Sequence, residues 1–155
     1  MSSATTYLSP HFSLVELTAS QTAERAGIKN IPGGAALENL RRLALVLEDV
    51  RTCLGDSAML VSSGYRSPTV NNLVGGALTS AHKDGRAADF VAPRFGGPRQ
   101  ICQRIVDAGI VFDQLIYEGT WVHLGIAKVG EPPRNYVLTA VFRPGQATQY
   151  LQGLQ

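Results

Sequence analysis

Three polar residues have the types and the spacing to hold a metal ion. His82 and Asp89 lie on either side of a glycine turn in SAHKDGRAADF (80–90), and His123 lies within WVHLG (121–125). Imidazole nitrogen and carboxylate oxygen are both good zinc ligands, and three protein ligands with an open fourth position are typical of a catalytic site. Such an ion lowers the pKa of water and polarises a carbonyl group. Residues of these types at this spacing could therefore hold a Zn²⁺ ion.

Asp89 and His123 are each flanked by apolar residues in segments that we expect to be strands. Burying a polar group without a partner costs on the order of a few kcal/mol, so each residue needs one. A shared metal ion would satisfy both. The alternative is that each pairs with a buried neighbour, and one such pairing is with each other.

Short strands are expected to carry these residues. Apolar runs bounded by turn residues predict strands at 59–62, 87–91, 113–118, 121–126 and 136–142. The second strand carries Asp89 and the fourth carries His123. A turn at Gly119-Thr120 is expected to join the third and fourth strands into a hairpin.

Helices are expected to flank these strands. Apolar residues recur at helical spacing and predict helices at 35–54, 98–108 and 67–74, with a shorter one within 12–26. In that last segment Ser13 is a plausible N-cap, and Glu16 would complete a capping box. Helices alternate with closely spaced strand pairs, so we predict an α+β fold: one domain with a small, mostly antiparallel sheet flanked by helices.

The composition is that of a globular protein with a single core. The chain has 155 residues, of which 45% are hydrophobic and 17% charged. We expect a domain at 12–145, between an extended N-terminal segment (1–11) and a loose polar tail (146–155). The net charge of +2 is too weak to indicate nucleic acid, but a mildly basic surface suits an anionic polymer such as a bacterial cell wall.

The N-terminal residues show no basic leader followed by an apolar block, and no apolar run is long enough to cross a bilayer. We therefore expect cytoplasmic synthesis without a signal peptide and no membrane span. A monomeric state is also expected. Action on a cell wall would then require release from the cell or delivery by a carrier.

Cys53 and Cys102 both fall on predicted helices, and neither has the spacing of a metal knuckle. Small apolar cysteines are common in protein cores, and cytosolic disulfides are rare. We expect two buried, reduced thiols.

The combined motifs resemble one family. SxHxxGxAxDF followed by WVHLG, with SGYRSPxVN upstream and FDQLI between them, is similar to the zinc D-alanyl-D-alanine peptidases, whose fold is shared with Hedgehog signalling domains. The resemblance runs from about Phe12 to Ile126 and is strongest to small single-domain members often encoded by bacteriophages and prophages. It implies zinc ligation by His82, Asp89 and His123.

The resemblance also implies two substrate-binding residues. Arg66 in SGYRS matches an arginine that holds the substrate's carboxylate, and a guanidinium group can bind a carboxylate through two parallel hydrogen bonds. The alternative for Arg66 is an ordinary surface arginine. Ser80 matches a serine that hydrogen-bonds substrate in the same pocket; its alternative is a loop or cap serine.

The general base departs from the family pattern. Hydrolysis needs a carboxylate that takes a proton from the attacking water and hands it to the leaving amine. In many relatives this acid lies three residues before the last histidine, but Thr120 stands there in this chain. Glu118 is the nearest acid and our predicted base, with Asp113 in reserve. The alternative for Glu118 is a solvated strand-end carboxylate.

Trp121 lies two residues before His123 and so shares its face of the strand. It could line the substrate cleft or fill the core. Tyr65, in SGYRS, has the same two possibilities.

These expectations combine into a zinc-dependent D-Ala-D-Ala carboxypeptidase or peptidoglycan endopeptidase. It would act on cell-wall peptides after release, as an endolysin does, or as part of a phage particle. Two alternatives remain. One is a non-catalytic or weakly active cell-wall-binding module of the same fold, which Thr120 favours. The other is a structural phage component, such as a tail-associated protein with this domain.

Overall fold

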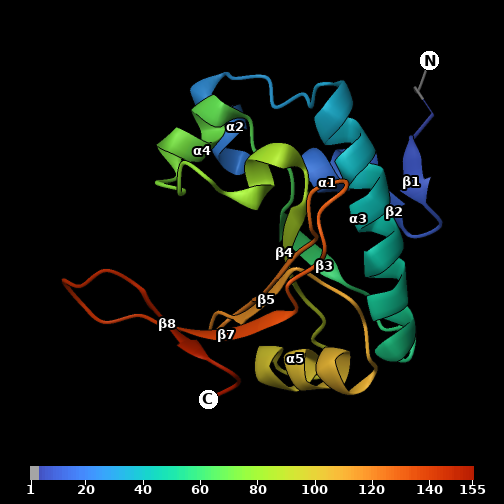
Figure 1. Cartoon of the computed structure of the whole chain (residues 1–155). Helices are drawn as coiled ribbons and strands as arrows, with labels where there is room; N and C mark the ends of the chain where they lie inside the picture. The colour runs from blue at the N-terminus through green and yellow to red at the C-terminus, as the bar shows by residue number, and fades with distance from the viewer. Residues whose placement is uncertain (1–3) are drawn as a thin grey trace. The chain divides into compact units, whose positions relative to one another are not determined.

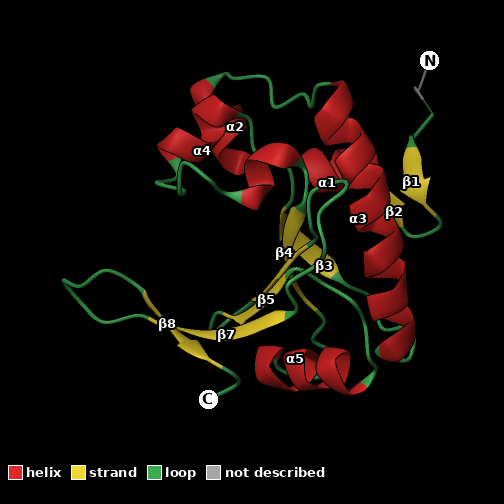
Figure 2. Ribbon diagram, in the orientation of Figure 1, coloured by secondary structure: helices red, strands yellow, loops and turns green. Residues whose placement is uncertain are grey.

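The structure is a computed structural model that describes residues 4–155. Helices and strands are interspersed along the chain (Figures 1 and 2), which confirms the predicted α+β class. The elements are, in order, β1 (Tyr7–Ser9), β2 (Phe12–Ser13), α1 (Leu14–Thr18), α2 (Gln21–Ala26), α3 (Gly34–Cys53), β3 (Leu60–Ser63), α4 (Pro68–Leu73), η1 (Ala81–Asp84), β4 (Ala87–Val91), α5 (Pro98–Asp107), β5 (Gln114–Tyr117), β6 (Val122–Gly125), β7 (Tyr136–Val141) and β8 (Gln149–Gln152).

Contacts between residues divide the chain into two compact units. The first comprises the described part of 1–48 together with Val61–Ala88, and the second comprises Asp49–Leu60 together with Asp89–Gln155. Strands β3 and β4 each contribute residues to both units. The larger sheet has the strand order β3-β4-β6-β5-β7-β8, and β1 and β2 form a separate two-stranded sheet.

The first unit is mostly helical. The apolar stripe of α3 explains its length, because Leu40, Leu43, Ala44 and Leu47 are all fully buried. Helix α1 begins at the predicted cap: Ser13 Oγ accepts a hydrogen bond from the Glu16 N–H at 3.1 Å.

Glu16 does not complete the predicted capping box. Among the described residues, the Ser13 N–H donates no hydrogen bond to the Glu16 carboxylate. The Glu16 Oε1 atom is buried without a hydrogen-bond partner there. The carboxyl group is partly buried, and this burial raises its pKa. Only the Ser13 half of the box therefore forms.

The second unit holds strands β5 to β8 and helix α5, which contacts β5 and β6. Strands β5 and β6 pair in antiparallel fashion, as do β7 and β8, whereas β5 and β7 run parallel. Strand residues alternate between faces. Leu115, Val122 and Leu124 on one face are fully buried, and Ile116 and His123 lie on the opposite face.

The prediction of a loose tail is wrong for residues 149–152, which form β8. All four are exposed, so no apolar pattern marks them as a strand. Hydrogen bonds hold the segment: β8 pairs with β7, and Thr139 Oγ1 donates to the Gly153 carbonyl at 2.8 Å. The Gln155 N–H donates in turn to Thr139 Oγ1 at 3.0 Å.

None of the helices in residues 4–155 is long and apolar enough to span a membrane.

The two cysteine thiols differ in burial. Cys102 is buried as predicted, but Cys53 is only half-buried, because it lies at the end of α3. Both are free of disulfides.

Candidate metal centre

His82 lies in a short turn of helix that its neighbours fix on both sides. Ser80 is the N-cap of η1, and its Oγ accepts from the His82 N–H at 3.3 Å. Gly85 ends the turn in the left-handed region, at φ +73°, where only glycine is unstrained. A Cβ atom on Gly85 would lie 2.5 Å from the Ala36 carbonyl oxygen, so this position also needs glycine for space.

The imidazole of His82 is buried and held by the backbone. Its Nδ1 atom lies 2.7 Å from the carbonyl oxygen of Gly64. A carbonyl oxygen only accepts, so Nδ1 carries the hydrogen and Nε2 carries the lone pair. Histidine ligands of metals typically donate their second ring nitrogen to a carbonyl or carboxylate in this way. The fold therefore presents His82 in the tautomer that ligates a metal through Nε2.

Asp89 and His123 lie on neighbouring strands, β4 and β6, and their side chains meet. Asp89 Oδ1 lies 2.9 Å from His123 Nδ1. The residues flanking Asp89, Ala88 and Phe90, are fully buried, whereas the side chains of Asp89 and His123 remain 16% and 12% exposed. Each polar side chain thus has the partner that its apolar surroundings demand, and both remain within reach of solvent.

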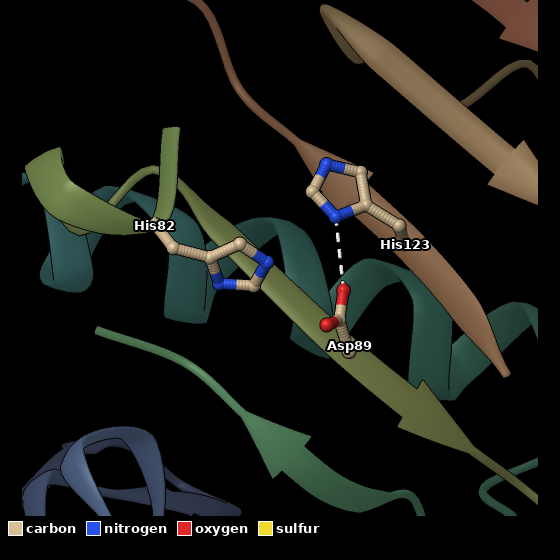
Figure 3. Close-up of side chains that lie close together, drawn as sticks. All are labelled: His82, Asp89 and His123. Atoms are coloured by element: carbon tan, nitrogen blue, oxygen red, sulfur yellow. Dashed lines mark hydrogen bonds and ion pairs between the residues drawn. The ribbon is translucent and has the colours of Figure 1, made fainter. Parts of the chain in front are cut away.

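The structure brings all three predicted ligands together. One ligand atom from each of His82, Asp89 and His123 lies within 4.8 Å of the others. Figure 3 shows the His82 ring directed toward the Asp89–His123 pair. Two imidazoles and one carboxylate are the donor types of catalytic zinc sites, which keep a position open for water or substrate. The residues present therefore fit a zinc ion.

Arg66 is linked directly to His82. Its backbone N–H donates to the His82 carbonyl oxygen at 3.0 Å. The residue is half-buried, and its role in binding a substrate carboxylate remains a prediction. A Cβ atom on Gly76 would lie 3.1 Å from Arg66 Nη1 and would overlap the Asn71 side chain. A side chain at position 76 would therefore displace Asn71 and crowd the guanidinium group of Arg66.

Asn30 is a structural residue of this site that the sequence analysis missed. Its Nδ2 donates to the carbonyl oxygens of Thr18 and Tyr65, at 2.8 and 2.9 Å, and its Oδ1 accepts from the Ser67 N–H at 2.8 Å. These bonds fix the backbone on both sides of Arg66. An asparagine in a glycine- and proline-containing loop was the only signal, and it is not specific.

Ser80 takes the cap role that was its alternative, through the hydrogen bond to His82 described above. Its predicted contact with substrate remains a prediction. Tyr65 is buried, which favours its core role, and this burial raises the pKa of its phenol.

The structure separates the two candidate bases. Glu118 directly follows β5, and its N–H donates to the Trp121 carbonyl at 3.0 Å. It stands two residues after Ile116, the β-sheet partner of His123, so Glu118 and His123 share one face of the sheet. The carboxylate is half-buried on that face.

Asp113 is occupied elsewhere. Its carboxylate accepts from Arg134 Nε and Nη2 at 3.0 and 2.8 Å, a bidentate pair that raises the pKa of Arg134. The Arg134 guanidinium also lies over the Tyr136 ring. Alternation along the chain places Asp113 on the face opposite His123. These positions favour Glu118 over Asp113 as the base.

Trp121 lies on the face of His123 and outside the buried core. Its ring centroid lies 6.0 Å from that of Phe142, and the rings are tilted by 37°. The indole Nε1 is buried without a hydrogen-bond partner among residues 4–155. The position favours a role in lining the face that carries the ligands.

Comparison with known proteins supports the same assignment. A family model described as Peptidase M15 matches residues 10–125. The zinc D-Ala-D-Ala carboxypeptidase of Streptomyces albus G is 46% identical to this chain over 46 residues, which are 30% of this chain and 18% of that enzyme. This chain thus matches less than a fifth of that relative's length. The family match covers most of the chain and includes all three candidate ligands, and it shows that the chain belongs to the peptidase M15 family.

Proposed function

We propose that this peptidase uses zinc to hydrolyse peptide bonds next to D-alanine in peptidoglycan stem peptides or cross-links. The observation that carries the proposal is the His82, Asp89 and His123 group, with the His82 tautomer set by Gly64. The printed activity of the Streptomyces relative supports the substrate class.

His82, Asp89 and His123 would hold the zinc ion. When bound, zinc supplies Lewis-acid chemistry, which polarises the scissile carbonyl and makes water a better nucleophile. The protein's part is to fix the donors: the Gly64 carbonyl orients one imidazole, and the strand pairing of β4 and β6 sets the other two side chains.

Glu118 would act as the general base. Its carboxylate would accept a proton from the water that attacks the carbonyl carbon, and a C–O bond would form there. As the C–N bond breaks, the same proton would pass to the leaving amine nitrogen. The position of Glu118 on the face of His123 supports this role.

Arg66 would hold a carboxylate of the substrate. Its planar guanidinium can donate two parallel hydrogen bonds to a carboxylate, such as the terminal carboxylate of D-alanine. Its backbone bond to His82 ties the position of this group to that of a zinc ligand. A terminal carboxylate would favour carboxypeptidase action, whereas a cross-linked substrate would place an internal group there.

Zinc analysis and digestion of purified peptidoglycan test the proposal. Wild type should contain about one zinc per chain and release D-alanine or open cross-links. His82→Ala should lose both properties. His11→Ala is the matched control, because His11 is exposed and pairs with Glu48 instead. No zinc in wild type, or equal cleavage by wild type and His82→Ala, would overturn the proposal.

A second candidate function is a wall-binding module without catalysis. Thr120, at the position of the family's usual acid, favours it. Wild type that retains wall fragments in a pull-down yet releases no product over days would support this candidate and exclude the peptidase.

We also propose that the protein acts on the wall after release from its cell or as part of a phage particle. The resemblance to phage-encoded members supports this. The neighbouring genes test it: a holin gene would indicate a lysis role, and tail genes would indicate a role in entry. Neighbours of neither kind would argue against both.

A further inference from the structure

The strand register aligns one face of β6, β5, β7 and β8 in the second unit. Ile116 pairs with His123 and with Leu138, and Leu138 pairs with Gln152. Residues that pair in register share a face, and so do residues two apart along one strand. Tyr150, two residues before Gln152, therefore lies on the same face as His123.

Glu118 and Trp121 belong to the neighbouring row of this face. They stand opposite each other at the β5–β6 turn, and Trp121 is two residues before His123. Continuing the β5–β7 register places Glu118 opposite Ala140, and Ala140 pairs with Tyr150. One row across the sheet thus runs from Trp121 through Glu118 to Tyr150.

Tyr150 lies in the row of Glu118, on an accessible part of this face. Burial raises its pKa, and the negative charges of Glu118 and Asp89 raise it further. Yet the residue is 52% exposed. A core tyrosine would be buried, so this exposure and the strand register leave the ring available to a ligand on this face.

We propose that Tyr150 is a substrate-binding residue of this peptidase: with Trp121, at the other end of the row, it forms an aromatic wall along the face that carries His123. The proposal rests on the function proposed above and adds a residue to it. The ring faces would pack against the methyl groups of alanine residues in the bound peptide. The neutral phenol would donate a hydrogen bond to a backbone carbonyl oxygen of that peptide.

Binding can be measured without cleavage, because Trp121 is the only tryptophan of the chain and reports on this face. The probe is an N-acetylated tripeptide that ends in D-Ala-D-Ala, titrated against zinc-depleted protein while Trp121 fluorescence is followed. The same peptide then gives KM and kcat with the zinc-loaded enzyme. Tyr150→Ala should raise Kd and KM about tenfold and leave kcat within about twofold. Tyr150→Phe keeps the ring and should raise Kd only about threefold.

Leu151→Ala is the matched control. Leu151 is the next residue of β8, is 42% exposed and points to the opposite face, so it reports any loosening of the hairpin. Its Kd and KM should equal those of wild type. If wild type cleaves and Tyr150→Ala matches Leu151→Ala, the wall is wrong while the peptidase stands. If wild type neither binds nor cleaves the peptide, both proposals fail. If Tyr150→Ala does not fold, the Kd of Tyr150→Phe tests the proposal instead. A Tyr150→Phe Kd equal to that of wild type would overturn the proposed hydrogen bond from the Tyr150 hydroxyl.

Discussion

The Nδ1 atom of His82 donates its hydrogen to the carbonyl oxygen of Gly64 across 2.7 Å. Arg66 lies two residues after Gly64 in the same loop, and its backbone N–H donates to the carbonyl oxygen of His82. The loop therefore holds both the ring and the backbone of this histidine. The position of this loop depends in turn on Gly64 and on Asn30, and substitutions at both residues test this.

Gly64→Ala should weaken zinc binding and destabilise the protein. A Cβ atom there would overlap the Leu17 carbonyl oxygen and lie 2.9 Å from its carbon, so the backbone must move. Overpacking of this kind costs about 1–3 kcal/mol in the free energy of unfolding. Displacing the carbonyl that orients His82 should weaken zinc affinity by about 10–100-fold. Thermal unfolding and competition with a zinc chelator measure the two effects.

Gly33→Ala is the control for this change, because a Cβ atom there would have no heavy atom within 4 Å. It should leave zinc affinity unchanged. Equal zinc affinity in Gly64→Ala and Gly33→Ala would contradict the orienting role of the Gly64 carbonyl.

Asn30→Ala should lower stability and weaken substrate binding together. The change removes three hydrogen bonds, to Thr18, Tyr65 and Ser67, and leaves part-buried backbone groups without partners. A loss of about 2–4 kcal/mol is expected, at about 1 kcal/mol per bond. KM should rise because the loop that carries Arg66 loosens, and urea unfolding with steady-state kinetics would show both effects. Asn72→Ala is the control, because Asn72 is exposed. If Asn30→Ala were as stable as Asn72→Ala, Asn30 would not hold the loop that carries Arg66.

Glu118→Gln should lower kcat and spare stability, whereas Asp113→Asn should lower stability and spare kcat. Glu118→Gln removes the proposed base and should lower kcat by about 10²–10⁴-fold, with little change in the melting temperature. Asp113→Asn weakens the bidentate pair with Arg134 and should cost about 1–3 kcal/mol of stability while kcat stays within a few-fold. Steady-state kinetics and thermal unfolding of both variants provide the comparison. A large kcat loss in Asp113→Asn alone would transfer the base role to Asp113.

Cys102 should resist thiol reagents in the folded protein. Burial raises the pKa of its thiol to about 12, and only the thiolate is nucleophilic, so almost none is reactive at pH 8. Cys53 is half-buried, and burial raises the pKa of its thiol as well, so it should react slowly. Both thiols should react in denaturant. Because the folded pKa of Cys102 exceeds its ordinary value of 9.0, its stabilising contribution is present below pH 9 and is lost as pH rises toward 12. Ellman's reagent counts the thiols; two fast thiols in the native protein would contradict the burial.

The sequence was most informative where a strong pattern coincided with local chemistry. The apolar repeat predicted a helix at 35–54, and α3 spans Gly34–Cys53. The predicted strand at 87–91 matches β4, because a short apolar run ends at turn residues on both sides. The grouping of His82, Asp89 and His123 was predicted from the family resemblance of the surrounding motifs, because the residues alone left each with an alternative partner.

The sequence was least informative where structure depends on distant backbone. The hydrogen bonds of Asn30 reach residues 12 to 37 positions away, and no local pattern encodes them. Strand β8 shows no alternation, because all its residues are exposed and only its pairing with β7 defines it. The parallel pairing of β5 with β7 was likewise hidden, because strand direction follows from the connection and not from composition.

Strand β8 ends the order β3-β4-β6-β5-β7-β8 and pairs with β7 alone. Deleting it would break one ladder and leave those of β4, β6, β5 and β7 intact. It also lies outside residues 10–125, the part that matches the family. In evolutionary terms this edge has room for variation: under the proposed function, new sequence here would alter the contacts of Tyr150 with the peptide and leave the strands of Asp89 and His123 paired as they are.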